Sequence, residues 1–370
     1  MNESFRIRMR GKAYMFKVSS IARICALIVA CLGSTVHAEE GHLRLALARN
    51  TITAAEETFT YAVPKQLGYF SQEGLEVSIL QTSGSTAALQ ALVSGSADVA
   101  YASSASIAAA IDKGAQLRAF AGITVQWPYF IGVPPGSPIK KISDLKGKKV
   151  GVISLASASY ADLQANLKIA GLSEEDVSIV PVGAGARAAA ALKSGQVDAI
   201  DSYSDSFTVM KQNGIELTLL PRPAEMNKLF SVTMVTSIKK LQEEPEQLAA
   251  FARAAYKGII YTYRFPESAL QLSFKEFPEL SGSADIQSKD AQNTAEAMKI
   301  ALADSIPATD VMPEKWGHWL DIPASRWDAL LQFAFDTKQT EKKLDVGSIW
   351  DNRLMPEIYS FDTKAIVEKL

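Results

Sequence analysis

Hydrophobic and polar positions follow first a strand period and then a helix period, and this order recurs along the chain. Residues 74–82, GLEVSILQT, alternate and then become apolar, which predicts a partly or fully buried strand. A helix is expected to begin near Ser83 and to end at Gly95, because glycine readily adopts the left-handed conformation that ends many helices. Residues 97–102, ADVAYA, predict the next strand, and a second helix is expected from Ser104. The expected apolar face of the first helix contains Leu89, Leu92 and Val93.

The same pattern returns one hundred residues later. Residues 91–103, ALVSGSADVAYAS, and residues 191–203, ALKSGQVDAIDSY, share alanine, leucine, serine, glycine and aspartate at equivalent positions. The second copy predicts a strand over 177–182, a helix that ends at Gly195 and a strand over 197–203. Each copy is a strand–helix–strand unit, which implies parallel strands and a right-handed crossover. Two such units in a chain of 370 residues predict two α/β lobes.

The loops that lead from strand to helix are rich in serine and glycine in both copies. Residues 148–167 repeat this form, with a strand, a serine-rich loop and a helix from about Tyr160. In open parallel sheets, ligands collect at the carboxyl ends of the strands, where helix N-termini present unpaired N–H groups. Each serine taken alone would be read as a helix cap. Several such loops together favour a binding cleft between the lobes.

The N-terminus has the pattern of an export signal. Basic residues precede an apolar run over residues 24–33, which is about half as long as a bilayer span requires. Small side chains then favour cleavage after Ala38, so residues 1–38 are expected to be a signal peptide. A lipoprotein attached through Cys31 is the alternative. Cys25 and Cys31 both lie in this leader, so the remaining chain would have no thiol, disulfide or cysteine-bound metal.

Charge and motifs exclude several classes of function. The leader carries six of the 38 basic and one of the 40 acidic residues, so the chain after residue 38 has a formal net charge of −7. Such a chain is a poor candidate for binding nucleic acid or an anionic membrane. Its histidines are His42 and His318, and it contains no nucleophile elbow, zinc-binding, phosphate-loop or dinucleotide-binding motif. We therefore expect no enzyme activity, no cofactor and no metal, and we expect the C-terminal helices to add packing but little chemistry.

Four segments carry a family resemblance: AVPKQLGYFSQEGLEVSI (residues 62–79), PIKKISDLKGKKVGV (138–152), ALKSGQVDAI (191–200) and KKLQEEPEQLAAFARAAYKGI (239–259). In this order they resemble segments of the substrate-binding proteins of ABC transporters, in the group for nitrate, sulfonates, taurine and thiamine precursors. The resemblance covers about residues 43–259 and is weaker in the C-terminal helices.

The resemblance implies an α/β protein with the two-lobed periplasmic-binding-protein (Venus-flytrap, type II) fold and a ligand cleft between the lobes. It implies that residues 43–127 and 240–370 form lobe one and that residues 128–239 form lobe two, with hinge crossings near Trp127 and Lys239. Ligand contacts made by both lobes would exist only in the closed form, so binding would shift the hinge equilibrium.

The resemblance implies ligand contacts from the loop after the opening strand, here Arg49, Asn50 and Thr53, and we expect further contacts from the polar loops of both lobes and from the hinge. Arg49 follows the opening strand and would either pair with an anionic head group or form an ion pair within the protein. Trp127 would either wall the ligand or pack in the core. Asp201 would accept from a hydroxyl, amine or ring N–H group, or else cap a helix. The full set is Arg49, Asn50, Thr53, Ser83, Gly84, Ser103, Ser104 and Trp127, followed in lobe two by Ser157, Ser159, Arg187, Asp201 and Tyr203.

The function that these features imply is that of a monomeric periplasmic receptor. It would bind a small molecule and deliver it to a membrane permease driven by an ATPase. Loop hydroxyls, glycine N–H groups and Arg49 favour a small anion, such as an aliphatic sulfonate like taurine, or nitrate. Trp127, Tyr203 and Asp201 would instead suit a thiamine pyrimidine precursor or another small aromatic compound. An exported ligand sensor is a further alternative.

Overall fold

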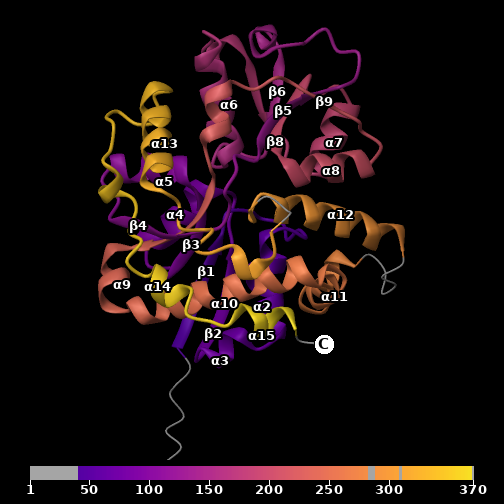
Figure 1. The fold of residues 1–370 in the computed structure, drawn as a ribbon. Helices are drawn as coiled ribbons and strands as arrows, with labels where there is room; N and C mark the ends of the chain where they lie inside the picture. Colours follow the sequence, from indigo (N-terminus) through magenta and orange to yellow (C-terminus); the bar gives the residue numbers. More distant parts are fainter. Residues whose placement is uncertain (1–40, 282–287, 308–310, 369–370) are drawn as a thin grey trace, which may run out of the picture. The chain divides into compact units, whose positions relative to one another are not determined.

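Two five-stranded sheets organise the chain in the computed structural model, which describes residues 41–281, 288–307 and 311–368 (Figure 1). The expected signal peptide and Cys31 lie outside the described residues. The first sheet has the order β2-β1-β3-β10-β4, with β1 (Gly41–Leu47), β2 (Leu75–Gln81), β3 (Val99–Ser103), β4 (Leu117–Gly122) and β10 (Val232–Ser237). The second has the order β7-β6-β8-β5-β9, with β5 (Tyr129–Val133), β6 (Lys149–Val152), β7 (Ser178–Pro181), β8 (Ala199–Tyr203) and β9 (Thr218–Leu219).

The duplicated segment forms the same unit in both sheets, which confirms the predicted strand–helix–strand reading. Strands β2 and β3 are joined by α4 (Ser85–Val93) and pair in parallel with β1, which lies between them. Strands β7 and β8 are joined by α7 (Ala186–Lys193) and pair in parallel with β6 in the same way. Gly95 at φ 73° and Gly195 at φ 70° end the two helices as expected. Val93, expected on the buried face of α4, is instead 64% exposed, because the last turn of this helix directs it to solvent.

One antiparallel strand lies inside each sheet, and the sequence pattern did not reveal either of them. Strand β10 pairs with β3 and β4, and β5 pairs with β8 and β9, all antiparallel. Strand β10 therefore belongs to the first sheet although it precedes the expected return crossing at Lys239. The lobe boundaries remain a prediction, and we propose that the return lies between Leu219 and Val232.

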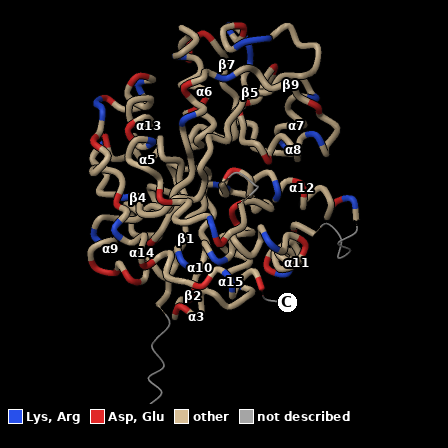
Figure 2. Tube along the Cα trace, viewed as in Figure 1, with Lys and Arg blue, Asp and Glu red and all other residues tan. Residues whose placement is uncertain are grey.

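Helices cover both sheets, and the longest of them, α10, packs in the core of the first sheet. Phe251 of α10 stacks on Phe70 with ring centroids 5.7 Å apart, and both rings are buried. The helices besides α4 and α7 are α2 (Val63–Gln66), α3 (Tyr69–Gln72), α5 (Ser104–Asp112), α6 (Ala158–Ile169), α8 (Ser204–Gln212), α9 (Ile238–Glu243), α10 (Pro245–Arg264), α11 (Pro266–Glu276), α12 (Lys289–Ala303), α13 (Ala324–Asp336), α14 (Met355–Ile358) and α15 (Thr363–Val367). Basic and acidic positions are interspersed along α9, α10 and α11 (Figure 2). Across the described residues, we find no helix with both the length and the apolar character needed to span a bilayer.

The loop before α4 meets the loop before α6, so the two sheets contact each other through their polar rims. Ser154 Oγ donates to the carbonyl oxygen of Ser83 at 2.6 Å, and the Thr86 N–H donates to the carbonyl oxygen of Ala156 at 3.1 Å. Gly84 stands between them at φ 148°, and a Cβ atom there would lie 2.5 Å from the Ala156 oxygen. Glycine is therefore required at this position for two reasons: the backbone conformation and the close approach of the neighbouring loop.

Gly84→Ala is expected to destabilise the protein more than Gly74→Ala, by about 2 kcal/mol. Both glycines have positive φ, but a Cβ at Gly74 meets nothing within 4 Å, so only Gly84→Ala adds a backbone clash to the conformational strain. Urea unfolding of the two variants measures the difference in the free energy of unfolding. Equal losses in the two variants would contradict the close contact between the loops.

Candidate ligand-binding site

A cavity of about 460 Å³ lies where the loops of the two sheets face each other. Its walls come from the carboxyl ends of parallel strands in both sheets, where polar loops were expected to meet. Helix α12, in the C-terminal part of the chain, forms a further wall. The lining residues come from within the segments 47–57, 101–103, 153–158, 183–187, 203–212 and 294–304, in which only some side chains face the cavity, and from single positions in other loops.

Seven of the thirteen predicted site residues line this cavity, and six do not. The seven are Arg49, Asn50, Thr53, Ser103, Ser157, Arg187 and Tyr203. The six are Ser83, Gly84, Ser104, Trp127, Ser159 and Asp201. The structure thus brings together the loops after β1, β3, β6, β7 and β8. That any of these residues contacts a ligand stays a prediction.

The predicted serines outside the cavity hold the surrounding loops in place. Ser104 is fully buried and donates its hydroxyl to the Phe230 carbonyl oxygen at 2.9 Å. Ser159 accepts from the Ile153 N–H at 3.0 Å and lies 2.9 Å, Oγ to Oγ, from Ser157, which does line the cavity. Ser83 and Gly84 take part in the contact between the two loops. These residues shape the cavity without facing it.

Trp127 and Asp201 lie behind the cavity, in a buried group of their own. The Trp127 ring packs edge-on against Tyr129 and Phe333, and its Nε1 donates to Asp162 Oδ1 at 2.6 Å. Asp201 is fully buried in β8, and burial together with Asp162 raises its pKa well above the ordinary value. Burial also raises the pKa of Asp162 to about 6. Trp127 is therefore a core residue here, and Asp201 caps no helix but lies in the sheet beside a second carboxyl group.

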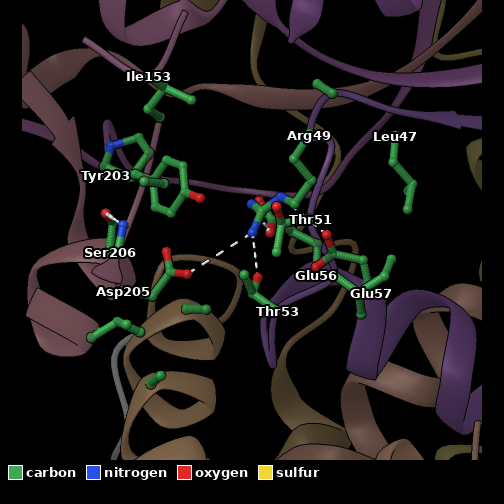
Figure 3. Close-up of a pocket in the computed structure, with 18 of the residues that line it drawn as sticks. Leu47, Arg49, Thr51, Thr53, Glu56, Glu57, Ile153, Tyr203, Asp205 and Ser206 are labelled. Atoms are coloured by element: carbon green, nitrogen blue, oxygen red, sulfur yellow. Dashed lines mark hydrogen bonds and ion pairs between the residues drawn. The ribbon is translucent and has the colours of Figure 1, made fainter. Parts of the chain in front are cut away.

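Arg49 is the charged centre of the cavity, and carboxylates surround it (Figure 3). Its Nη2 lies 2.6 Å from Glu56 Oε2, its Nε lies 3.0 Å from Glu57 Oε1, and its Nη1 lies 3.9 Å from Asp205 Oδ2. Nη1 also donates to Thr53 Oγ1 at 2.5 Å, and the guanidinium lies 4.9 Å from the centre of the Tyr203 ring. Burial lowers the pKa of Arg49, but Glu56 and Glu57 outweigh this effect and hold it well above the ordinary value.

Three carboxyl groups of the cavity are hard to ionise because they are buried together. Burial raises the pKa of Glu57 to about 8, with Arg49 opposing the shift and Glu56 adding to it. Burial raises the pKa of Asp205 to about 7 and that of Asp304 to about 6. These groups can therefore exchange protons near neutral pH. A ligand with N–H donors or a positive charge would favour their ionised forms.

The sequence reading missed the carboxyl groups and the apolar part of this wall. Glu56 and Glu57 directly precede the π-helical turn η1 (Thr58–Ala62), and their place shortly after Arg49 in the chain was the available signal. Tyr101 and Tyr129 add two further rings. Glu57 Oε2 and Ser103 Oγ have no hydrogen-bond partner in the described part of the chain. The aliphatic lining residues are Leu47, Ile52, Ile153, Val209, Val232 and Leu280.

Helix α12 was expected to add packing only, yet it contributes Thr294, Ala297 and Ala301 to the cavity, and Asp304 follows directly after it. The sequence pattern could not show this because the helix lies far along the chain from the loops that it covers. For the residues that the structure describes, no group of three or more histidine, cysteine or acidic side chains is arranged to hold a metal ion.

The chain belongs to the NMT1/THI5-like family, whose model matches residues 56–269. A riboflavin-binding protein, RibY, of Chloroflexus aurantiacus is 25% identical over 59% of this chain and 62% of its own length, so the match spans about three fifths of that protein. A formylaminopyrimidine-binding protein of Halalkalibacterium halodurans is 24% identical over 70% of this chain and 78% of its own. A 4-amino-5-hydroxymethyl-2-methylpyrimidine phosphate synthase of Legionella pneumophila is 22% identical over 82% and 90%.

Solved structures confirm the predicted periplasmic-binding-protein fold. The alkanesulfonate-binding protein SsuA of Xanthomonas axonopodis, bound to MOPS, aligns with a TM-score of 0.62 at 20% identity, over 85% of this chain and 99% of its own. The periplasmic aliphatic sulphonate binding protein SsuA of Escherichia coli aligns with a TM-score of 0.58 at 21% identity, over 84% and 92%. At this identity the likeness concerns the fold.

The stability of the protein is expected to fall as the pH rises from about 5 to 8. The native state holds the Glu57 proton up to a pKa of about 8, whereas the unfolded chain releases it near the ordinary value, so the native state binds more protons across this range. Asp205 and Asp304 act in the same direction. Glu57→Gln should therefore make the free energy of unfolding less dependent on pH, which urea unfolding at pH 5, 6.5 and 8 measures.

The matched control is Glu175→Gln, since Glu175 is exposed in a loop of the second sheet. This variant should keep the pH dependence of the wild type. If Glu57→Gln keeps it as well, then Glu57 is ionised in the native state over the whole range and our account of the buried cluster is wrong.

Proposed function

We propose that this chain is the extracytoplasmic receptor of an ABC importer and that its ligand is a neutral or cationic nitrogen heterocycle. The observation that carries the proposal is that Arg49, the cation at the centre of the cavity, is already paired with Glu56 and Glu57. An anionic head group would have to displace Glu56 or Glu57 from Arg49 and leave a buried polar group without its partner, which is unfavourable. A heterocycle with N–H donors would instead add donors that these carboxyl groups lack.

The balance of charge supports this choice. In the described part of the chain, four carboxyl groups and two guanidinium groups line the cavity: those of Glu56, Glu57, Asp205, Asp304, Arg49 and Arg187. Like-charge contact in a site with little water costs several kcal/mol, so each ionised carboxyl group of the cavity selects against sulfonate and nitrate. Burial, with a smaller contribution from Glu56, raises the pKa of Glu57 and Asp205, and a ligand that is cationic or donates N–H groups favours their ionised forms.

The shape of the wall supports an aromatic ligand. Tyr101, Tyr129 and Tyr203 line the cavity together with aliphatic side chains. Flat apolar walls with a few placed polar groups are typical of sites for small organic ligands. The relatives named for riboflavin and formylaminopyrimidine bind compounds of this kind, according to their names.

We propose binding and transport in preference to catalysis. Among the cavity residues in the described ranges there is no histidine or cysteine, so Ser103 and Ser157 have no neighbouring base of the kind that activates a hydroxyl nucleophile. One relative is named as a synthase, so catalysis is the alternative to this proposal.

In the proposed function, residues 1–38 direct export to the periplasm. The ligand-bound monomer then delivers its ligand to a permease coupled to an ATPase.

A small anion is the second candidate, and Arg187 is the observation that favours it. Arg187 is exposed, lines the cavity and lies in the first turn of α7, where a helix N-terminus also attracts negative charge. The sulfonate-binding proteins share this fold. An anion held there would contact Arg187 and leave the Arg49 cluster unchanged.

Thermal unfolding against a ligand panel is expected to separate the two candidates. Riboflavin and formylaminopyrimidine should raise the melting temperature by a few degrees, since a ligand at about one hundred times its Kd adds roughly 2.7 kcal/mol. Taurine, MOPS and nitrate should leave it unchanged. A shift with the anions alone, lost in Arg187→Gln, would overturn the heterocycle proposal in favour of the second candidate.

Calorimetric titration of variants then tests the acidic cluster. Asp205→Asn should weaken binding of the heterocycle that shifts the melting temperature by about tenfold, the loss expected for one charge-assisted hydrogen bond. Glu175→Gln, which removes an exposed carboxylate elsewhere on the second sheet, should bind as the wild type does. Unchanged binding by Asp205→Asn would argue against recognition by this carboxyl group.

A further inference from the structure

Helix α12 is held against α8 at both of its ends. Gln212 Nε2, at the end of α8, donates to the Asn293 carbonyl oxygen at 2.8 Å. Ser204 Oγ, at the start of α8, donates to Asp304 Oδ2 at 2.8 Å. The two helices lie side by side in opposite directions (Figure 1). Since α8 follows β8 directly, α12 is fixed to the second sheet although it comes from the C-terminal part of the chain.

One face of α12 forms a wall of the cavity. Thr294, Ala297, Ala301 and Asp304 all line it, and their spacing of three, four and three residues places them on a single helix face. Ala297 and Ala301 are the middle of this face and are both buried. Larger side chains at these two positions would extend into the cavity.

The cavity has the volume and the polar groups of a site for a ligand of several rings. An apolar cavity of roughly 150 Å³ accommodates benzene, and this cavity measures about 460 Å³. Glu57 and Ser103 are each 1% exposed and line the same space, with Glu57 Oε2 and Ser103 Oγ unpartnered among the described residues. Buried polar atoms without partners require a donor or acceptor from elsewhere.

We infer that α12 sets the size of the ligand, and that Ala297 and Ala301 leave room for a fused heteroaromatic compound of two or three rings. This inference rests on the proposed function, because it takes the cavity to be the site for a nitrogen heterocycle. The ring system lies against α12 at Ala297 and Ala301. Its polar edge supplies the hydrogen-bond partners that Glu57 and Ser103 lack.

The α12 segment lies outside the part of the chain that matches the family model, which ends at residue 269. Selection by size therefore comes from a segment that the family match does not cover.

Calorimetric titration with riboflavin as a three-ring probe and formylaminopyrimidine as a one-ring probe tests the inference. Ala297→Leu should weaken riboflavin binding by at least about tenfold, the effect of overfilling a packed site. It should change formylaminopyrimidine binding by less than about threefold, because one ring leaves space for the added side chain. Ala303→Leu is the control, since Ala303 lies on the same helix but is exposed and outside the cavity.

Failure of the inference and failure of the proposed function give different results. If the wild type binds riboflavin and Ala297→Leu binds it equally well, the role of α12 is wrong and the proposed function stands. If the wild type binds only the one-ring probe, the size inference is likewise overturned. If it binds neither probe but binds taurine or nitrate, the proposed function itself fails. Should Ala297→Leu unfold, Ala301→Val takes its place with the same expected order of affinities.

Discussion

The cavity of this protein is organised around the burial of one guanidinium group. Arg49 is buried among Glu56, Glu57 and Asp205, and its charge favours the ionised forms of Glu57 and Asp205 against the effect of burial. A buried guanidinium group left without a carboxylate partner costs about 3–5 kcal/mol, so Arg49 depends on these neighbours. Arg49 follows a strand of the first sheet and Asp205 follows β8 of the second. The same electrostatic requirement therefore joins the rims of both sheets.

The two sheets repeat one arrangement because each needs the same rim. In both, a central parallel strand lies between the two strands of the repeated unit, and the polar loops leave from the carboxyl ends. An antiparallel strand, β10 or β5, then pairs with the last strand of the unit, and β4 or β9 forms the edge of the sheet. The loops approach so closely at Gly84 that only glycine fits between them. Helix α12 closes the space from the side, and its alanines leave the cavity open.

The ligand that we propose differs from the first expectation because Arg49, the cation in the sequence argument, is already paired within the protein. In the sequence, Arg49 and a set of hydroxyl groups suggest an anion. In the structure, Arg49 is paired, and carboxyl groups outnumber guanidinium groups along the described cavity wall. Of the two ligand classes considered from the sequence, the aromatic one fits this balance. The cavity volume of about 460 Å³ further supports a ligand of more than one ring.

The sequence by itself determined the repeated strand–helix–strand units, the glycines at positions 95 and 195 that end their helices, and the loops that line the cavity. These features depend on periodicity and on backbone conformation, which are local properties. It could not determine that Trp127 packs in the core, that Asp201 lies beside Asp162, or that Ala297 and Ala301 face the cavity. Those outcomes depend on contacts between residues far apart in the chain, such as Trp127 and Asp162, and only the tertiary structure decides which side chains meet.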